Sequence, residues 1–344
     1  VAGGAGPFAA DLRLDDGRLE PGSALVLEPR ETTVAFLDYR ARGRGRVELR
    51  VDGDGARLAA RLADYEITRR GHDAPHVLGS GLVVAVATPD ARLPPSFEAA
   101  RVAVRLPPAE IPNLAFYNAY LPEAAGLRID GGRGTIEGRF EARAAAGTGS
   151  GELRLAGKDV GVTYGGTGLR GDFELASRFP RAELERRSFR LDGTRLTVTG
   201  GRLAGDPDAE PWAARVLLPR GLLQPGRPVV LRTDVTAALS DAHPVVAVFA
   251  ERHPLPGWVL KALDLGEVAA TARVEAGEER VEIRELEAEA DPLRLAGRLV
   301  LAGPSRKTGR LLLTYRSLAI GFDLRGGETD LKLLGAREWF EKGE

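Results

Sequence analysis

The sequence predicts an all-β fold with a few short helices, in which an extended antiparallel β-meander of two or three degenerate repeats curls into an open, taco-like groove. Three observations predict it. Apolar and polar residues alternate with a period of two along most of the chain, as they do in strands with one apolar face and one wetted face. Turn-forming pairs separate these segments at intervals of about 10 to 15 residues. Segments with helical periodicity are rare, and no alternation of strands with helices indicates a parallel sheet.

The clearest strand is predicted at residues 293–301, where the odd positions are apolar while Arg294 and Arg298 point to the opposite face. Near the N-terminus, Asp52-Gly53-Asp54-Gly55 separates two alternating segments, and a two-residue Gly-Asp centre there predicts a tight hairpin. Further turns are predicted at Gly131-Gly132, Gly165-Gly166, Asp192-Gly193, Gly200-Gly201 and Gly326-Gly327.

Two segments interrupt the strand pattern. Residues 111–125 carry Leu114, Tyr117 and Leu121 at helical spacing after a proline, and residues 241–263 are expected to form two short helices. A meander follows each of them, which suggests two copies of one helix-capped unit. The predicted domains are therefore an N-terminal β-meander at 1–110 and helix-capped β-repeats at 111–240 and 241–344. We expect the last of these to continue the sheet of the repeat before it.

Composition excludes several classes of function. The chain has 48 Lys and Arg against 49 Asp and Glu, so there is no basic excess with which to bind nucleic acid. It has no Cys, which rules out disulfides and thiolate chemistry, and no run of about 18 apolar residues that would span a bilayer as a helix. It also has no Met, so we expect a processed chain with a leader or anchor upstream of Val1.

Candidate catalytic and metal-binding residues are few, and each has a simpler interpretation. His72 and His76 have the spacing of a zinc-binding helix, but Pro75 lies between them and favours a solvated loop. Ser80 and Ser150 lie in Gly-Ser-Gly triplets that lack the nucleophile elbow. Glu285, Glu287 and Glu289 share one face of a predicted strand and are expected to be solvated. We therefore expect no enzyme, no metal and no cofactor.

The apolar faces are the remaining candidate for function. Some twenty strands share about three short helices, so helices alone cannot cover the sheet, and its apolar side must be covered by a second sheet, by closure into a barrel or by a ligand. On physical grounds a filled β-sandwich and an open groove are equally possible. The residues predicted to line a groove are Leu153, Leu155, Phe173, Leu175, Leu191, Val198, Leu293, Leu295, Leu299, Leu313, Leu318, Ile320, Phe322 and Leu324.

Glycine-punctuated strands at 149–155 and 169–175, a short Leu-Pro helix at 114–122 and the tail at 321–333 are the segments that carry a family resemblance. In these the chain resembles the periplasmic part of AsmA-like and TamB-like proteins, a superfamily of bacterial bridge-like lipid-transport proteins. The likeness covers most of residues 30–340 and lies in the general pattern of strands, turns and short helices, with no highly specific motif. The terminal domain with which TamB engages an outer-membrane partner is not recognisable.

The resemblance implies a β-groove protein in the periplasm of a Gram-negative cell envelope, anchored in the inner membrane by a segment that this sequence lacks. It implies that phospholipid acyl chains are held or moved along the groove between membranes. The alternative is a non-catalytic envelope scaffold, or an outer-membrane assembly factor, that acts through protein–protein contacts. A hydrolase is a distant third possibility.

Overall fold

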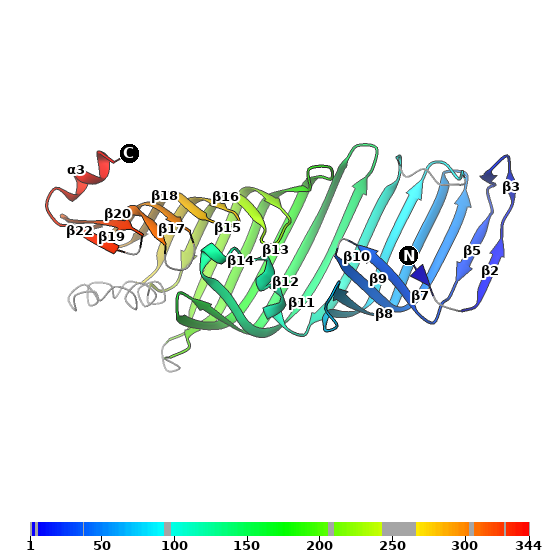
Figure 1. The fold of residues 1–344 in the computed structure, drawn as a ribbon, viewed down its shortest axis with the longest axis horizontal. Helices are drawn as coiled ribbons and strands as arrows, with labels where there is room; N and C mark the ends of the chain where they lie inside the picture. Colours follow the sequence, from blue (N-terminus) through cyan, green and yellow to red (C-terminus); the bar gives the residue numbers. More distant parts are fainter. Residues whose placement is uncertain are drawn as a thin grey trace. The chain divides into compact units, whose positions relative to one another are not determined.

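The computed structural model describes residues 2–3, 6–36, 38–92, 98–205, 210–242, 266–302, 306–326 and 328–343. Within these ranges nearly all regular structure is β-strand, and every named strand except β3 and β4 belongs to one antiparallel sheet (Figure 1). The sheet is open and is not closed into a barrel. These findings confirm the predicted all-β fold with few short helices.

The chain divides into two compact units, which we describe separately. Unit 1 comprises Val1–Asn113, Arg133–Ala156 and Arg178–Arg187, and unit 2 comprises Leu114–Gly132, Gly157–Ser177 and Ser188–Glu344. The division into domains at 1–110, 111–240 and 241–344 stays a prediction, as does the internal repeat.

Unit 1 is built from short N-terminal strands followed by long ones. The short strands are β1 (Ala2–Gly3), β2 (Phe8–Asp11), β3 (Leu14–Asp15), β4 (Arg18–Leu19), β5 (Ala24–Leu27) and β6 (Thr32–Phe36). The long strands are β7 (Tyr39–Asp52), β8 (Gly55–Arg69), β9 (Pro75–Thr88) and β10 (Arg101–Ile111). Parts of β11 (Leu127–Arg143), β12 (Thr148–Tyr164) and β13 (Thr167–Glu183) complete the unit.

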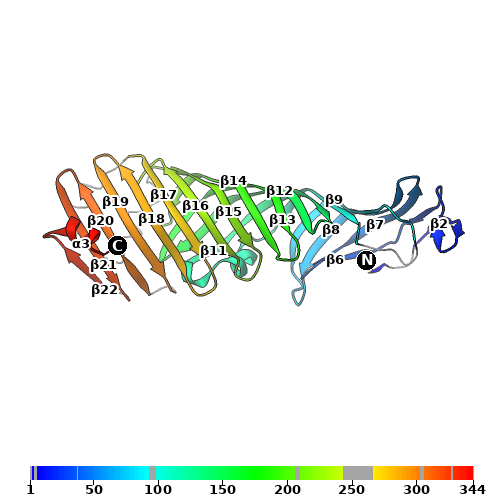
Figure 2. The same ribbon diagram turned by 90° about the horizontal axis from the view of Figure 1, so that it is seen from above.

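Unit 2 contains the remaining parts of β11 to β13 and a regular meander in which each strand pairs with the next (Figures 1 and 2). The strands are β14 (Ser188–Leu203), β15 (Trp212–Gln224), β16 (Val230–Leu239), β17 (Val268–Ala276), β18 (Val281–Ala290), β19 (Leu293–Leu301), β20 (Lys307–Tyr315), β21 (Leu318–Arg325) and β22 (Glu328–Lys332). The helices are η1 (Leu114–Tyr120), η2 (Glu123–Ala125) and α3 (Ala336–Glu341).

The hairpin predicted from Asp52-Gly53-Asp54-Gly55 is present. Strand β7 ends at Asp52 and β8 begins at Gly55, and these two residues are paired. The Asp54 amide donates a hydrogen bond of 2.9 Å to the Asp52 carboxylate, which holds the two-residue loop in its turn. Strand β19 likewise has the predicted bounds, with Arg294 and Arg298 exposed.

Three of the five predicted glycine turns are wrong, because the glycines lie inside long strands. Gly131-Gly132 lies within β11, and both Asp192-Gly193 and Gly200-Gly201 lie within β14. At Gly193 the backbone φ is 67°, and Asp192 and Gly193 are exposed while the residues on either side are buried. The strand continues through Gly193, since Asp192 pairs with Arg220 and Thr194 with Leu218 in unbroken register. The register of β14 shifts only between Val198 and Gly201, where Gly200 has a φ of 61° and a bulge forms without ending the strand.

The helix predicted at residues 111–125 is present only as the two 3-10 helices η1 and η2. The Asn118 side chain takes the place of a strand neighbour: its amide donates to the Ile129 carbonyl at 2.8 Å, and its oxygen accepts from the Ile129 amide at 2.7 Å. This tie to β11, together with Pro122, limits η1 to a short segment. The helices predicted within 241–263 lie almost entirely outside the described residues.

Candidate functional site

The cross-strand register of unit 2 aligns its apolar residues into rows. Leu295 lies opposite Leu313, and Leu313 lies opposite Ile320 on the next strand. On the other side of Leu295 the row continues to Ala288 and then Ala270. Opposed residues in a sheet share a face. Five adjacent strands, β17 to β21, therefore contribute to one apolar row, and Figure 2 shows them side by side.

Parallel rows extend this apolar face across the meander from β14 to β21. One of them passes through Leu191, Gly221, Thr233, Val274, Ile283, Leu299, Gly309 and Leu324. Another passes through Val198, Ala214, Leu239 and Val268 and then through Ala290, Leu293, Tyr315 and Leu318. Val268 packs against the cluster that contains Ala290, which joins the two halves of this row. We call this surface the apolar face of unit 2.

Ten of the residues predicted to line a groove lie on this face. They are Leu191, Val198, Leu293, Leu295, Leu299, Leu313, Leu318, Ile320, Phe322 and Leu324. Phe173 and Leu175 lie on β13, where the Phe173 ring is beside Gly157. Leu153 and Leu155 belong to the part of β12 that lies in unit 1, so they are not part of the apolar face of unit 2.

Most of the apolar face is only half-buried. Leu191 and Leu324 are buried, Leu295, Leu299, Leu313 and Ile320 are of intermediate exposure, and 46% of Leu318 is exposed. Fully buried core residues in a sandwich would instead be shielded on both sides. The face is thus less protected than a closed core would make it.

Two short segments cover the ends of the rows. Ala124 of η2 packs against Val281 and Leu301. At the opposite ends of the same strands, Ala242 packs against Ala290, with Val268 and Leu293 beside them. Both covers place alanine rather than a large side chain over the sheet. Among the described residues, these core clusters leave the middle rows around Leu295 and Leu313 uncovered.

Helix α3 packs on the opposite face of the sheet. Gly321, which lies opposite Leu312 and Lys332, has no side chain, and the Trp339 ring occupies the space where a Cβ would lie. The guanidinium of Arg310 lies 5.0 Å from the centre of the Trp339 ring, a cation–π distance. Because Gly321 and Phe322 alternate, α3 does not cover the face that carries Phe322.

The opposite face of unit 2 carries an extensive set of ion pairs. Glu282 accepts a hydrogen bond of 2.8 Å from Arg284 and also pairs with Arg280 at 3.0 Å. The hydrogen bond from Arg284 lowers the pKa of Glu282, while partial desolvation opposes it. Arg273 bridges Asp234 and Glu285. The expectation that Glu285, Glu287 and Glu289 are exposed is confirmed.

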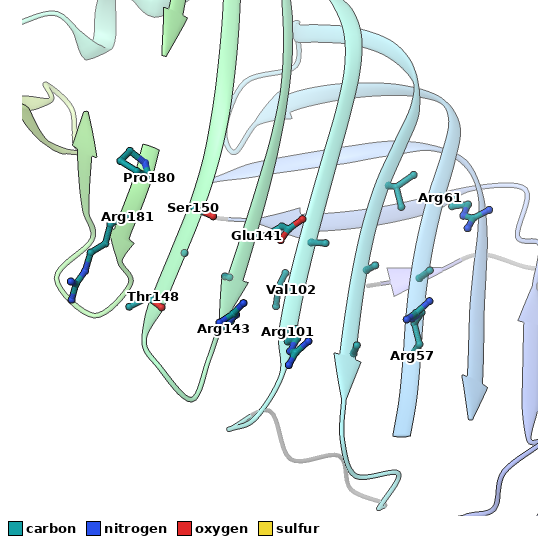
Figure 3. Close-up of a pocket in the computed structure, with 17 residues that line it drawn as sticks. Arg57, Arg61, Arg101, Val102, Glu141, Arg143, Thr148, Ser150, Pro180 and Arg181 are labelled. Atoms are coloured by element: carbon teal, nitrogen blue, oxygen red, sulfur yellow. The ribbon is translucent and has the colours of Figure 1, made fainter. Parts of the chain in front are cut away.

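Sequence reasoning missed a second feature, a hollow of about 880 Å³ in unit 1 (Figure 3). Its lining comes from β8 to β13 and includes five arginines, Arg57, Arg61, Arg101, Arg143 and Arg181, and one acid, Glu141. These arginines are far apart in the sequence, so no local motif reveals the cluster. Only the strand register brings them together, and a spacing pattern does not give the register.

The structure also places four polar residues that the sequence singled out, namely His72, His76, Ser80 and Ser150. His72 and His76 have ring centroids 5.9 Å apart, but the described residues contain no group of three or more potential metal ligands. His76 is buried in β9, contrary to the expected solvated loop, because β9 begins at Pro75 and includes it. Ser80 and Ser150 lie in β9 and β12 rather than in loops.

The fold and this face define a class: an open antiparallel β-sheet protein with one apolar face that its own described residues cover only at the ends. Comparisons with protein-family models, with curated proteins and with solved structures give no match. None of the described helices is both long and apolar enough to cross a bilayer.

Proposed function

We propose that the apolar face of unit 2 binds phospholipid acyl chains, and that the protein holds or bridges lipid between membranes. The observation that supports this proposal is the alignment of apolar residues across β14 to β21 with only half-burial at residues such as Leu295 and Leu313. An apolar surface of this extent in water is a binding surface far more often than a bare one.

Acyl chains suit this surface chemically. Burying each methylene group is worth about 0.8 kcal/mol and requires no directional contact. An acyl chain therefore gains the same free energy at whichever position along the rows it binds. The rows offer aliphatic and aromatic side chains and small residues such as Ala270, Ala288 and Gly297, which leave shallow depressions between the larger ones. A ligand could then slide along the face without breaking specific hydrogen bonds.

The proposed setting follows the resemblance to AsmA-like and TamB-like proteins: the periplasm of a Gram-negative bacterium, with attachment to the inner membrane through a further segment. The ion-paired opposite face is suited to an aqueous compartment. The proposed role is non-enzymatic and needs no cofactor. Phospholipid, or another lipid with acyl chains, is the proposed ligand.

The test is lipid binding by the whole chain. Purified protein should carry phospholipid detectable by mass spectrometry, and it should take up a fluorescent fatty-acid analogue. Absence of both signals would contradict the proposal. The decisive variant is Leu295→Asn with Leu313→Asn, which places two amides at opposed positions in the middle of the uncovered rows.

The matched control uses the next pair along the same two strands. Ala296 lies opposite Leu312, and both point to the other face. Asparagine at these two positions changes the same strands by the same chemistry, so uptake should fall for the Leu295 and Leu313 variant and stay near wild type for the control. Equal losses in the two variants would mean that uptake does not depend on the apolar face.

One observation favours the scaffold alternative. Strand β22 pairs with β21 and forms an edge of the described sheet, and the adjacent side chains are exposed: Leu331 by 52%, Leu333 by 64% and Leu334 by 95%. An exposed edge with apolar residues can receive a strand from another protein. Crosslinking from a residue in β22 that captures a defined protein partner, in cells where no lipid is captured, would support this alternative.

A further inference from the structure

The arginine-lined hollow of unit 1 lies on the face of the sheet opposite to that unit's apolar residues. On β8, Arg57 and Arg61 alternate with Leu58 and Leu62, and the register carries this alternation onto the neighbouring strands. Within unit 1 the hollow and the apolar residues of these strands therefore lie on opposite faces of the sheet. Figure 3 shows Arg57, Arg101 and Arg143 on three different strands around it.

Two of these arginines lie directly opposite each other. Arg101 of β10 pairs with Arg143 of β11 in the register. Like charges at opposed positions of a sheet repel and destabilise it. Among the described residues, neither arginine forms an ion pair, although Glu141, two residues from Arg143 on the same strand, also lines the hollow.

Other opposed arginines in unit 1 are compensated by an acid. Arg50 faces Arg57 and bonds to Glu48 at 2.5 Å. Arg46 faces Arg61 and pairs with Glu28 at 2.8 Å. In each case one partner of the opposed pair has an acid of its own. The pair of Arg101 and Arg143 differs from them, since no acid in the part of the chain that the structure describes pairs with either member.

A third opposed pair of arginines is compensated by an acid, as the pairs of Arg50 with Arg57 and Arg46 with Arg61 are. Arg105 faces Arg139, and Arg139 pairs with Glu152 at 3.0 Å. The five arginines and one glutamate of the hollow give it a net charge of +4, although the formal net charge of the whole chain is -1. Arg181 pairs with Glu183 at 3.9 Å, whereas the other four arginines of the hollow form no ion pair among the described residues. Such a concentration of unpaired positive charge within an otherwise balanced surface is typical of a ligand site.

The floor of the hollow is made of small residues. Ala59, Ala85, Ala87 and Ala103 lie between the arginines, and the remaining apolar lining residues are Val83, Val102, Ala142 and Pro180. The volume of about 880 Å³ falls within the range of small-molecule sites, about 300–1,000 Å³. A rim of guanidinium groups over a small apolar floor fits a compact anion that carries a nonpolar portion.

We propose that this hollow binds the phosphate of an anionic phospholipid headgroup, with Arg101 and Arg143 as the central pair and Arg57 on the far side of Ala87. Guanidinium groups bind phosphate oxygens bidentately, and the alanine floor accommodates the glycerol carbons. Nucleic acid fits less well, because the chain as a whole has no basic excess to follow a long polyanion. The proposal does not depend on the acyl-chain function of unit 2.

The test compares the whole chain with the double variant Arg101→Gln and Arg143→Gln. Flotation with vesicles of phosphatidylcholine alone and with added phosphatidylglycerol should show binding only to the anionic vesicles, at constant ionic strength because salt screens exposed charges. A charge-assisted hydrogen bond contributes about tenfold in affinity, so the double variant should bind roughly 100-fold more weakly. Removing the opposed charges should leave the unfolding temperature unchanged or higher, which separates lost binding from lost folding.

The control removes two arginines of unit 1 that lie outside the hollow. Arg42 and Arg44 are exposed and paired with Glu31 and Asp64, and Arg42→Gln with Arg44→Gln changes the net charge equally. This variant should keep at least half of the wild-type binding. An equal loss in both variants would overturn the site and leave only a general charge effect.

Two competitors distinguish the source of the phosphate. Glycerol 3-phosphate should displace the vesicles only at far higher concentration than the lipid phosphate present. Equal affinity for glycerol 3-phosphate would overturn the lipid assignment in favour of a soluble phosphate. A single-stranded oligonucleotide that competes better than either would overturn it in favour of nucleic acid.

Discussion

The cost of truncating leucines on the apolar face of unit 2 should depend on how exposed each one is. Leu311 and Leu318 lie on adjacent strands of that face, but 2% of Leu311 is exposed against 46% of Leu318. Leu311 packs beside Gly297 and opposite Phe322. Leu311→Ala should therefore lower the free energy of unfolding by about 3 kcal/mol, the cost of a cavity at a buried leucine.

Leu318→Ala should cost only about 1 kcal/mol. Full burial of a leucine side chain is worth about 1.5–3 kcal/mol, and nearly half of this one is already in water and leaves no enclosed cavity. Urea denaturation followed by circular dichroism measures both values, provided that the slope with denaturant is the same for wild type and variants. A cost for Leu318→Ala equal to that for Leu311→Ala would mean that another surface covers the face, and the open-face reasoning would fail.

Three further outcomes are expected from single sites in unit 2. Thr194→Val removes a buried hydrogen bond of 2.8 Å to the Ser177 hydroxyl, leaves that hydroxyl unpartnered, and should destabilise the protein by about 1–3 kcal/mol in urea denaturation. Glu282→Gln should remove a stabilisation that wild type has above pH 4.5 and loses as pH falls through the pKa of Glu282, which the hydrogen bond from Arg284 lowers. Denaturation across acidic pH should show the two proteins converging. Gly297→Val should destabilise by about 3 kcal/mol, because a Cβ there overlaps the Arg310 carbonyl oxygen.

Each of these has an internal control. The double variant Ser177→Ala with Thr194→Val should recover part of the loss, since it leaves no lone hydroxyl. A pH-independent difference between wild type and Glu282→Gln would contradict the lowered pKa of the carboxylate. Gly205→Ala should be nearly neutral, because no atom lies within 4 Å of the position where its Cβ would be.

The fold class was predictable because alternation with a period of two is a local property of each strand. The sequence at 293–301 shows it directly, and the structure has β19 at those residues. Strand ends were less predictable. A pair such as Gly200-Gly201 can form either a turn or a bulge with a positive φ, and only the pairing of the strand with its neighbours decides between them.

The two candidate sites differ in how much the sequence reveals. Ten of the fourteen predicted groove residues share one face. Each was chosen from the apolar positions of an alternating strand, and consecutive strands pair, so their apolar sides coincide. The arginine hollow could not be predicted in this way. Whether Arg101 faces Arg143 depends on the register between β10 and β11, which includes a shift after Leu106 that no spacing rule supplies.

Pairing of each strand with its immediate neighbours in β14 to β22 also bears on how such a chain changes length during evolution. Duplication or loss of one hairpin would leave the remaining strands antiparallel, with the same residues on each face of the sheet. It would change the width of the sheet across its strands by about 10 Å, which is two strand spacings. No distant pairing would need to be rebuilt. The span of the protein is in this sense a quantity that selection can adjust in small, equal increments.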